Sequence, residues 1–428
     1  MRRILWIALV IMLTGIWGSS VSGKGDRWIR IGLAQNQSMI ELTTFASGEQ
    51  LVATVGGGEQ VIPFEGTRLV FTWDGEQILL NNAPVSAGPI ILKPGSALLG
   101  WNQRRYRGEL IVTAVNGKLQ LVNRLLLEDY LRGVVPKEVP PAWPLAALKA
   151  QAIAARTYTA ASFNRHGKDG FDLCAASHCQ VYGGADVETP MTDEAVLGTA
   201  GLVIVHNGKI ISAAYHSSSG GYTKDASGVW GFSRPYLVSV PDWDQNSPYI
   251  AWNRMLDWSH VQALIGRSYP KIGRVYRIIP EAYNAFGYCT KLKLLGDLGE
   301  QAVTTETFRM VLGLPSANIQ LGMVYGPEPL IHLWWLPGRS YPDAFIAENG
   351  TAGVTVEVLN PPWDQPDAWA WLRDKEPVRL MVKGSGYGHG VGLSQWGAKG
   401  MADAGFNERQ ILEYYYKGVR IVSLDEIQ

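Results

Sequence analysis

One stretch, Tyr130–Tyr158, constrains the fold of this chain more than any other part of its sequence. It joins a proline-rich segment around Glu138 to a run rich in alanine, leucine, lysine and glutamine. The prolines two positions before and after Glu138 disfavour regular helix, so we expect a rigid loop there. Pro144 suits the first turn of a helix, and the run after it favours a helix from Leu145 to about residue 162.

The expected helix has two distinct faces. Lys149 and Arg156 lie two turns apart on one of them. Another face carries small and apolar residues at three- and four-residue spacing and should pack closely: Leu145, Leu148, Ala152, Ala155 and Thr159. A carboxylate in a rigid loop just before a buried helix is the arrangement that a catalytic acid needs. A surface glutamate in a proline-rich turn is the alternative interpretation.

Four stretches of the chain, in this order, resemble the SpoIID/LytB family, the sporulation protein D and amidase-enhancer group. They are LEDYLRGVVPKEVP with WPLAALKAQAIAARTY, then FDLCAASHCQVYGG, AAYHSSSGGYT, and GSGYGHGVGLSQWGAKGMADAGFNERQILEYYYKGV. The resemblance extends over roughly Arg105 to Val422 and is looser before that range.

The resemblance implies an activity. Enzymes of this family are lytic transglycosylases that cleave the bond between N-acetylmuramic acid (MurNAc) and N-acetylglucosamine (GlcNAc) in peptidoglycan, leaving 1,6-anhydro-MurNAc ends. Glu138 stands at the position of the catalytic acid, and the implied substrate is glycan stripped of its stem peptides. The other branch of the family implies an alternative, a non-catalytic amidase enhancer that binds peptidoglycan.

A short segment holds four side chains that are typical metal ligands. His166, Cys174, His178 and Cys179 have the spacing H-x7-C-x3-H-C, and two thiolates with two imidazoles suit a tetrahedral, structural zinc ion. The spacing is not that of a common zinc finger, and in an exported protein Cys174 and Cys179 could instead form a disulfide. The resemblance is compatible with zinc, because some relatives hold zinc in the corresponding loop, whereas others lack it.

Two loops are expected to contact the glycan. Asn207-Gly208 predicts a tight hairpin turn, after which the chain reaches the sequence HSSSGG. Glycine at every second position from Gly384 to Gly392 lets the backbone approach a ligand or another strand closely. With the helix cations, the expected substrate-binding residues are Lys149, Arg156, Tyr158, His216, Ser217, Ser218, His389 and Gln395. For Arg156, positioning of the Glu138 loop is the alternative.

The first 23 residues have the layout of a secretory signal peptide. Arg2 and Arg3 precede an apolar run that is shorter than a membrane span, and small residues follow. We expect cleavage between Ser19 and Lys24 and a mature protein that works outside the cytoplasm, in the periplasm, in the cell wall or as a secreted protein. An uncleaved N-terminal membrane anchor is the alternative.

The remaining chain is expected to be an α+β protein. Residues 24–104 read as short strands separated by Gly, Asn and Asp turns, which predicts a small β-rich N-terminal module. Residues 105–428 are then the SpoIID/LytB-like catalytic domain that the resemblance implies, with antiparallel sheets, a few helices and an insertion at about 322–377.

The charge of the chain limits its partners. Lysine and arginine number 38, as do aspartate and glutamate, so the balance gives no general attraction to nucleic acid. The expected partners are peptidoglycan glycan strands and, for the enhancer alternative, a cell-wall amidase.

Overall fold

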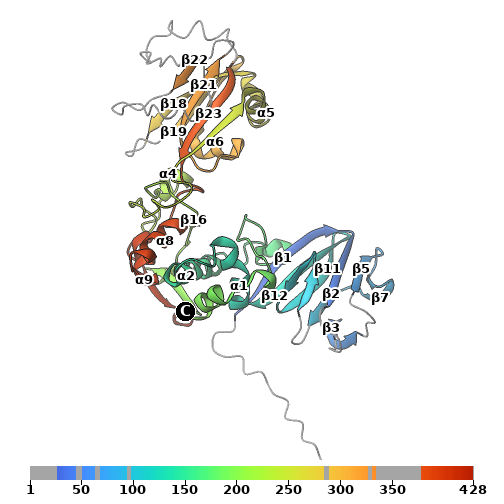
Figure 1. Cartoon of the computed structure of the whole chain (residues 1–428). Helices are drawn as coiled ribbons and strands as arrows, with labels where there is room; N and C mark the ends of the chain where they lie inside the picture. The colour runs from blue at the N-terminus through green and yellow to red at the C-terminus, as the bar shows by residue number, and fades with distance from the viewer. Residues whose placement is uncertain are drawn as a thin grey trace, which may run out of the picture.

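The computed structural model describes residues 27–44, 51–62, 68–93, 98–283, 289–325, 330–333 and 377–427. Figure 1 shows a β-rich part from the N-terminal residues, a central part with the long helices, and a second lobe beyond α4 (Ala226–Trp230). The expected α+β class and β-rich N-terminal region are confirmed. The expected leader at 1–23 and most of the expected insertion at 322–377 lie outside the described residues.

Two mainly antiparallel sheets make up the N-terminal part. One has seven strands in the order β13 (Leu173–Cys174), β1 (Trp28–Gln37), β12 (Lys118–Leu126), β11 (Glu109–Val115), β8 (Ile90–Lys93), β3 (Leu51–Val55) and β4 (Gly58–Ile62). The other has six, in the order β10 (Arg104–Tyr106), β9 (Leu99–Trp101), β2 (Met39–Thr44), β5 (Arg68–Trp73), β6 (Ile78–Leu80) and β7 (Ala83–Ser86). Because β8 pairs with β11, the first sheet crosses the boundary expected between residues 104 and 105.

Asn-Gly pairs form the turns of two hairpins. Asn116 and Gly117 connect β11 to β12 with φ of 50° and 75°. Asn207 and Gly208 connect β14 (Leu202–His206) to β15 (Lys209–Ile210) with φ of 50° and 76°. Positive φ at both central residues is the geometry that matches the twist of the flanking strands. The hairpin expected at Asn207-Gly208 is thus confirmed.

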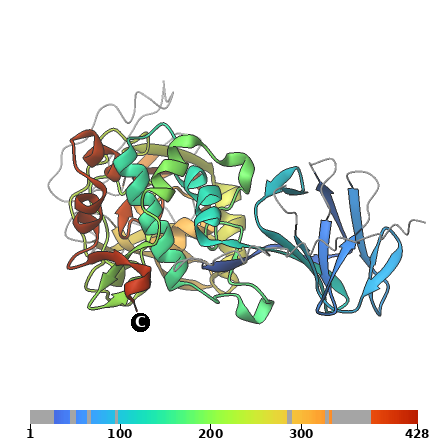
Figure 2. The ribbon, with the colours of Figure 1, turned by 90° about the horizontal axis from the view of Figure 1, so that it is seen from below.

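The central part is organised around one helix, α2. It follows Pro144 and ends before Ser162, as expected, and the expected stripe that includes Leu148 and Ala155 packs in the core shared with the N-terminal sheets. The opposite face, which includes Ile153, packs in a second core with the C-terminal helices. Figure 2 shows these helices gathered beside the N-terminal strands. The helices of this part are α1 (Leu127–Glu138), α2 (Leu145–Ala161), α3 (Pro190–Leu197), α8 (Gln395–Asp403) and α9 (Glu408–Tyr415).

No helix in the described part of the chain combines the length and apolarity needed to cross a membrane.

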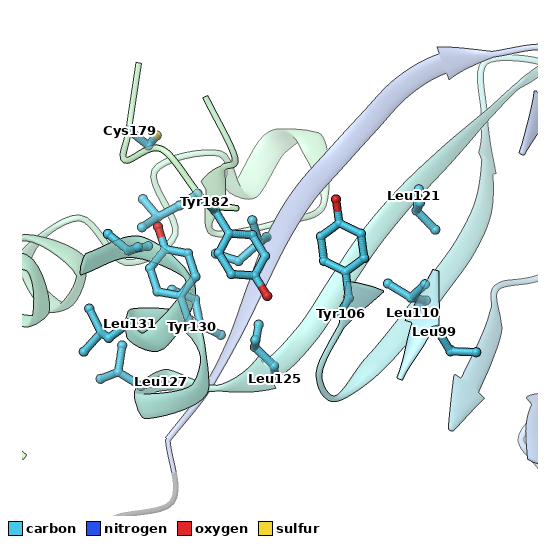
Figure 3. Close-up of a cluster of buried hydrophobic side chains, with 14 of the residues drawn as sticks. Leu99, Tyr106, Leu110, Leu121, Leu125, Leu127, Tyr130, Leu131, Cys179 and Tyr182 are labelled. Carbon is cyan, nitrogen blue, oxygen red and sulfur yellow. The ribbon is translucent and has the colours of Figure 1, made fainter. Parts of the chain in front are cut away.

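Three tyrosines join the helices to the N-terminal sheets. Tyr182 lies between Tyr130 of α1 and Tyr106 of β10, with ring centroids 5.1 Å and 5.9 Å away (Figure 3). Its hydroxyl donates a 3.0 Å hydrogen bond to Asn123 Oδ1. Buried aromatic pairs of this kind add to the stability that their buried area supplies. The loop that carries Tyr182 is therefore held firmly against α1.

The second lobe has its own hydrophobic core, and sequence reasoning did not predict it as a separate unit. Its helices are α5 (Trp258–Ser268) and α6 (Thr305–Leu312). One of its sheets has the order β17 (Trp252–Asp257), β23 (Pro377–Ser385), β21 (Asn318–Tyr325) and β22 (Leu330–Leu333). The other has the order β18 (Val275–Tyr283), β19 (Cys289–Gly296) and β20 (Gly299–Thr304).

The glycine-rich loop returns the chain from β23 to the central part. It lies against β16 (Tyr215–His216), which pairs with β24 (Leu393–Ser394). A Cβ at Gly388 would stand 2.8 Å from Cβ of His216, and one at Gly392 would stand 2.2 Å from the carbonyl oxygen of Ala214. Side chains at these positions would clash. The close approach that the alternating glycines predicted is therefore an approach to another strand.

Candidate active site

Glu138 is the last residue of α1 and does not lie in a rigid loop. The expected loop was wrong because Pro136 is accommodated within the last turn of the helix, where it removes only a single backbone donor. Pro140 ends the helix, since it disfavours helical backbone at the preceding Val139, which is extended with φ of −136° and ψ of 148°. Pro140 therefore fixes Glu138 at the helix end.

The Glu138 carboxyl group is partly buried and is held by three groups. The backbone N–H of Val181 donates a hydrogen bond to Oε1 over 3.3 Å, and the side chains of Gln395 and Tyr215 also hydrogen-bond to the carboxyl group. Burial raises the pKa of Glu138, and the three hydrogen bonds, which stabilise the ionised form, lower it by less. The net result is a raised pKa, as a general acid that works near neutral pH requires.

A buried amide orients Tyr215 toward Glu138. Gln180 Nε2 donates to the Tyr215 hydroxyl oxygen over 3.0 Å, so the Tyr215 proton is available for the carboxyl group. The other end of the amide is fixed as well, because Gln180 Oε1 accepts hydrogen bonds from Thr159 Oγ1 at 2.7 Å and from the Tyr130 hydroxyl at 3.3 Å. The core helix α2 is thereby connected to Glu138 through side chains.

Sequence reasoning missed both members of this connection. Gln180 directly follows the predicted metal ligand Cys179, and Tyr215 directly precedes the predicted His216. Their places inside the stretches that carry the family resemblance were the available signal.

Three of the predicted substrate-binding residues lie beside Glu138 and Tyr215. Gln395 contacts the carboxyl group itself. The carbonyl oxygen of Ser217 accepts a 2.9 Å hydrogen bond from the N–H of Trp396, the residue that follows Gln395. The Tyr158 ring meets the Tyr215 ring edge-on, with centroids 6.4 Å apart.

Arg156 has a structural position instead of the expected place in the substrate site. Its side chain is fully buried, with 0% of it exposed. The guanidinium group donates to both carboxylate oxygens of Glu128 at 2.8 Å and 2.6 Å, and to the carbonyl oxygens of Val196 and Leu202. This buried, bidentate ion pair leaves no surface of Arg156 for a substrate.

Ser218 and Lys149 also lie away from Glu138. Ser218 is buried, and its hydroxyl donates to Asp244 Oδ2 over 2.5 Å. The same carboxylate accepts the backbone N–H groups of Gly220 and Gly221, so it fixes the serine-rich turn. Lys149 lies on α2 with Cε near Gly198, and within the described ranges no hydrogen bond joins it to Glu138.

His216 and His389 form a pair of their own, with ring centroids 5.5 Å apart. His216 follows Tyr215 on β16, and successive side chains of a strand point to opposite faces. The two histidines therefore lie on the other face of β16 from Tyr215 and Glu138. Burial, and for His389 also the proximity of His216, lowers the pKa of both rings to about 3, which keeps them neutral.

The four predicted metal ligands converge. Their donor atoms all lie within 4.8 Å of one another. His166 Nε2 is 3.3 Å from His178 Nδ1, Cys179 Sγ is 3.5 Å from both of these atoms, and Cys174 Sγ is 3.7 Å from His178 Nδ1. Zinc–nitrogen and zinc–sulfur bonds of ordinary length imply edges of about 3.3–3.8 Å in a tetrahedral site. The donor set and its geometry fit zinc.

The surroundings of the cluster agree with this fit. His166 Nδ1 lies 3.0 Å from Asp169 Oδ2, a contact that fixes the tautomer and leaves Nε2 for a metal. Cys174 and Cys179 are free thiols in the structure. The chain runs from Cys179 directly through Gln180 to Val181, the two residues that support Tyr215 and Glu138.

The fold and the site define an α+β protein with one partly buried acid at a helix end and a two-cysteine, two-histidine cluster beside it. Residues 115–206, which include both, match the family model described as SpoIID, Stage II sporulation protein. The chain thus carries a SpoIID domain, and its resemblance to the SpoIID/LytB family is confirmed.

Curated relatives match over most of this chain. The stage II sporulation protein D of Bacillus subtilis is 27% identical over 322 residues, 72% of this chain and 77% of that protein. The amidase enhancer of the same organism is 31% identical over 307 residues, 68% of this chain and 40% of that protein. An uncharacterised protein of Brachyspira hyodysenteriae is 28% identical over 330 residues, 76% of this chain and 74% of that protein.

Proposed function

We propose that this protein is a peptidoglycan lytic transglycosylase that cleaves the MurNAc–GlcNAc bond of glycan strands, with a preference for strands stripped of stem peptides. The observation that carries the proposal is the environment of Glu138, a partly buried carboxyl group with a raised pKa. The similarity to stage II sporulation protein D supports a role in cell-wall processing.

Glu138 performs two proton transfers in the proposed reaction. Its acid form gives a proton to the glycosidic oxygen while the bond from that oxygen to C1 of MurNAc breaks. The resulting carboxylate removes the proton from the C6 hydroxyl of the same MurNAc, and the C6 oxygen bonds to C1 to close the 1,6-anhydro ring. The products together have the composition of the substrate, and Glu138 has regained its proton.

A single carboxyl group is sufficient for this reaction. Hydrolysis of a glycoside uses a second carboxylate, either to activate water or to attack C1. Within the described ranges, no other carboxylate hydrogen-bonds to Glu138 or shifts its pKa. Val181, Gln395 and Tyr215 stabilise the carboxylate that forms after the first transfer, because all three hydrogen-bond to the charged form.

A structural zinc ion belongs to the proposal. His166, Cys174, His178 and Cys179 would hold it, and four protein ligands leave no coordination position for water or substrate. Its contribution would be to fix the loop that presents Gln180 and the Val181 N–H to the active site.

The proposed substrate requires an extracytoplasmic location, which agrees with the signal peptide predicted at residues 1–23. N-terminal sequencing of the mature protein should find a first residue between about 20 and 24. A protein that starts at Met1 would instead support the uncleaved anchor.

The amidase enhancer is the second candidate, and the 31% identity to the protein of that name is the observation that favours it. One experiment separates the two functions. Purified protein is incubated with glycan strands without stem peptides, and the products are identified by mass spectrometry. Anhydro-MurNAc ends support the transglycosylase. Intact glycan, together with faster action of an added cell-wall amidase, supports the enhancer.

A further inference from the structure

A cavity of about 250 Å³ lies between the central part and the second lobe. Its walls come from the segment that includes Lys224 and leads into α4, and from the N-terminal end of α6 with the start of β21. Figure 1 shows α4 directly below this lobe. Tyr215 and Glu138 lie on the opposite face of β16 from His216, whose neutral ring is close enough to Lys224 for the ammonium charge to affect its pKa. The cavity is thus separate from the candidate active site.

Two hydrogen-bond acceptors in the cavity wall have no partner among the residues that the structure describes. Asn318 is only 3% exposed, and its amide nitrogen donates to the carbonyl oxygen of Ser219 over 2.8 Å. This bond fixes the amide and leaves Oδ1, which is buried without a hydrogen-bond partner in the described part of the chain. Glu306 Oε2 is likewise buried and unpartnered there. A buried acceptor without a donor costs free energy, so a ligand that supplies donors would be stabilised.

The charge of Glu306 is already balanced. Arg309 donates to Glu306 Oε1 from Nε at 2.9 Å and from Nη2 at 2.6 Å. The remaining oxygen therefore favours a neutral donor, such as a hydroxyl or an amide N–H, over a second cation.

Lys224 supplies a positively charged hydrogen-bond donor to the cavity. Its backbone N–H donates to Gly390 over 2.6 Å, and its side chain lies along that glycine. Among the described residues its ammonium group makes no hydrogen bond or ion pair, although it shares the cavity with Glu306. An ammonium group held in this way favours an anionic ligand.

We propose that this cavity binds one acidic sugar, with its carboxylate on Lys224 and its hydroxyl or amide N–H groups on Glu306 and Asn318. The apolar C–H faces of a sugar ring suit the apolar part of the wall, which includes Val229, Ala317 and the exposed ring of Tyr222. Asp225 also lines the cavity, and its Oδ1 accepts hydrogen bonds from Ser227. The volume is below the ~300–1,000 Å³ that is usual for larger ligands, so a single ring fits. The choice of MurNAc as the acidic sugar rests on the proposed function.

The test is calorimetric titration of the full mature chain with MurNAc and GlcNAc, two monosaccharides that differ by the lactyl ether group that carries the carboxylate. The wild type should bind MurNAc at least about tenfold more tightly, as expected for a charge-assisted hydrogen bond. Lys224→Met should abolish this preference. Lys118→Met, a change at the exposed first residue of β12, should preserve it.

The pH dependence of the wild type gives a second readout that requires no variant. Burial lowers the pKa of Lys224 to about 8, with Glu306 raising it and Arg309 lowering it to a lesser degree. His216 and His389 face the same lysine and stay neutral. The preference for MurNAc should therefore be present at pH 7 and be lost as the pH rises through about 8, because Lys224 then loses its charge.

Equal binding of the two sugars by the wild type would overturn the proposal, and so would a preference that survives in Lys224→Met. A preference that disappears in Glu138→Gln would also overturn it, because MurNAc would then occupy the candidate active site. In a third case, the wild type shows a MurNAc preference that depends on Lys224 and yet leaves glycan strands uncleaved. This pair of results would support the sugar site in this cavity and refute the proposed transglycosylase activity.

Discussion

The backbone N–H of Val181 donates a hydrogen bond to Glu138 Oε1 over 3.3 Å, and Val181 stands only two positions after Cys179 in the chain. The residue between them, Gln180, orients Tyr215 toward the same carboxyl group. One loop thus combines the predicted metal ligands with two supports of the proposed catalytic acid. Loss of the metal should therefore also lower the activity of the site around Glu138.

Replacing the proposed acid should abolish turnover. Glu138→Gln keeps the size and polarity of the side chain but cannot release and regain a proton, so the rate of glycan cleavage should fall by about 100- to 10,000-fold. Product analysis by mass spectrometry measures the rate, and a pull-down with insoluble glycan should show retained binding. Glu194→Gln, a change at an exposed position of α3, is the matched control. An unchanged rate in Glu138→Gln would exclude the proposed role.

Removing the Tyr215 hydroxyl should shift the pH profile of cleavage. The hydrogen bond from Tyr215 lowers the pKa of Glu138, so Tyr215→Phe should raise this pKa further. The acid form of Glu138 then persists to higher pH, and the alkaline limb of the kcat/KM profile should shift to higher pH. A lower rate with an unmoved limb would mean that Tyr215 acts on the substrate and not on the acid.

Removal of zinc should weaken both the fold and the activity. Protein purified without added metal should contain about one zinc per chain, as one tetrahedral site implies. Cys179→Ser should lose the metal, lower the melting temperature and reduce cleavage by about 10- to 100-fold, because the loop that holds Glu138 is released. Cys289→Ser, which changes a buried cysteine of the second lobe, should retain the metal. Protein without zinc that shows a Cys174–Cys179 disulfide by mass would contradict this prediction.

Replacing Arg156 should lower stability. Arg156→Met leaves the Glu128 carboxylate without its cation in a largely buried position, and such changes cost about 3–5 kcal/mol. Urea denaturation measures the free energy of unfolding, with Arg420→Met on an exposed strand position as the control. A fully stable Arg156→Met variant with a raised KM would restore the substrate-binding role that the sequence suggested.

The sequence predicted the parts of the site that depend on local spacing. The four metal ligands come from one short segment of the chain, and their donor atoms lie within 4.8 Å of one another. Arg156 was misplaced because its partner Glu128 lies 28 positions earlier, and only the packing of α1 on α2 brings the two together.

The sequence also could not show that the side chains of Tyr215 and His216 point to opposite faces, because that arrangement depends on tertiary structure. β16 has only two residues, too few for an alternating pattern to be read from sequence. Its strand character comes from pairing with β24, which lies 178 positions later in the chain at the pairing Tyr215↔Leu393.

The position that Pro140 gives to Glu138 has an electrostatic consequence. Peptide dipoles align along a helix, so the C-terminal end of α1 carries a partial negative charge, and a carboxylate near such an end is disfavoured by roughly 0.3–1 kcal/mol. The backbone of α1 therefore acts in the same direction as burial and favours the protonated acid. Replacing Pro140 and Pro141 together with residues that let the helix continue would move that negative end away and make Glu138 a stronger acid.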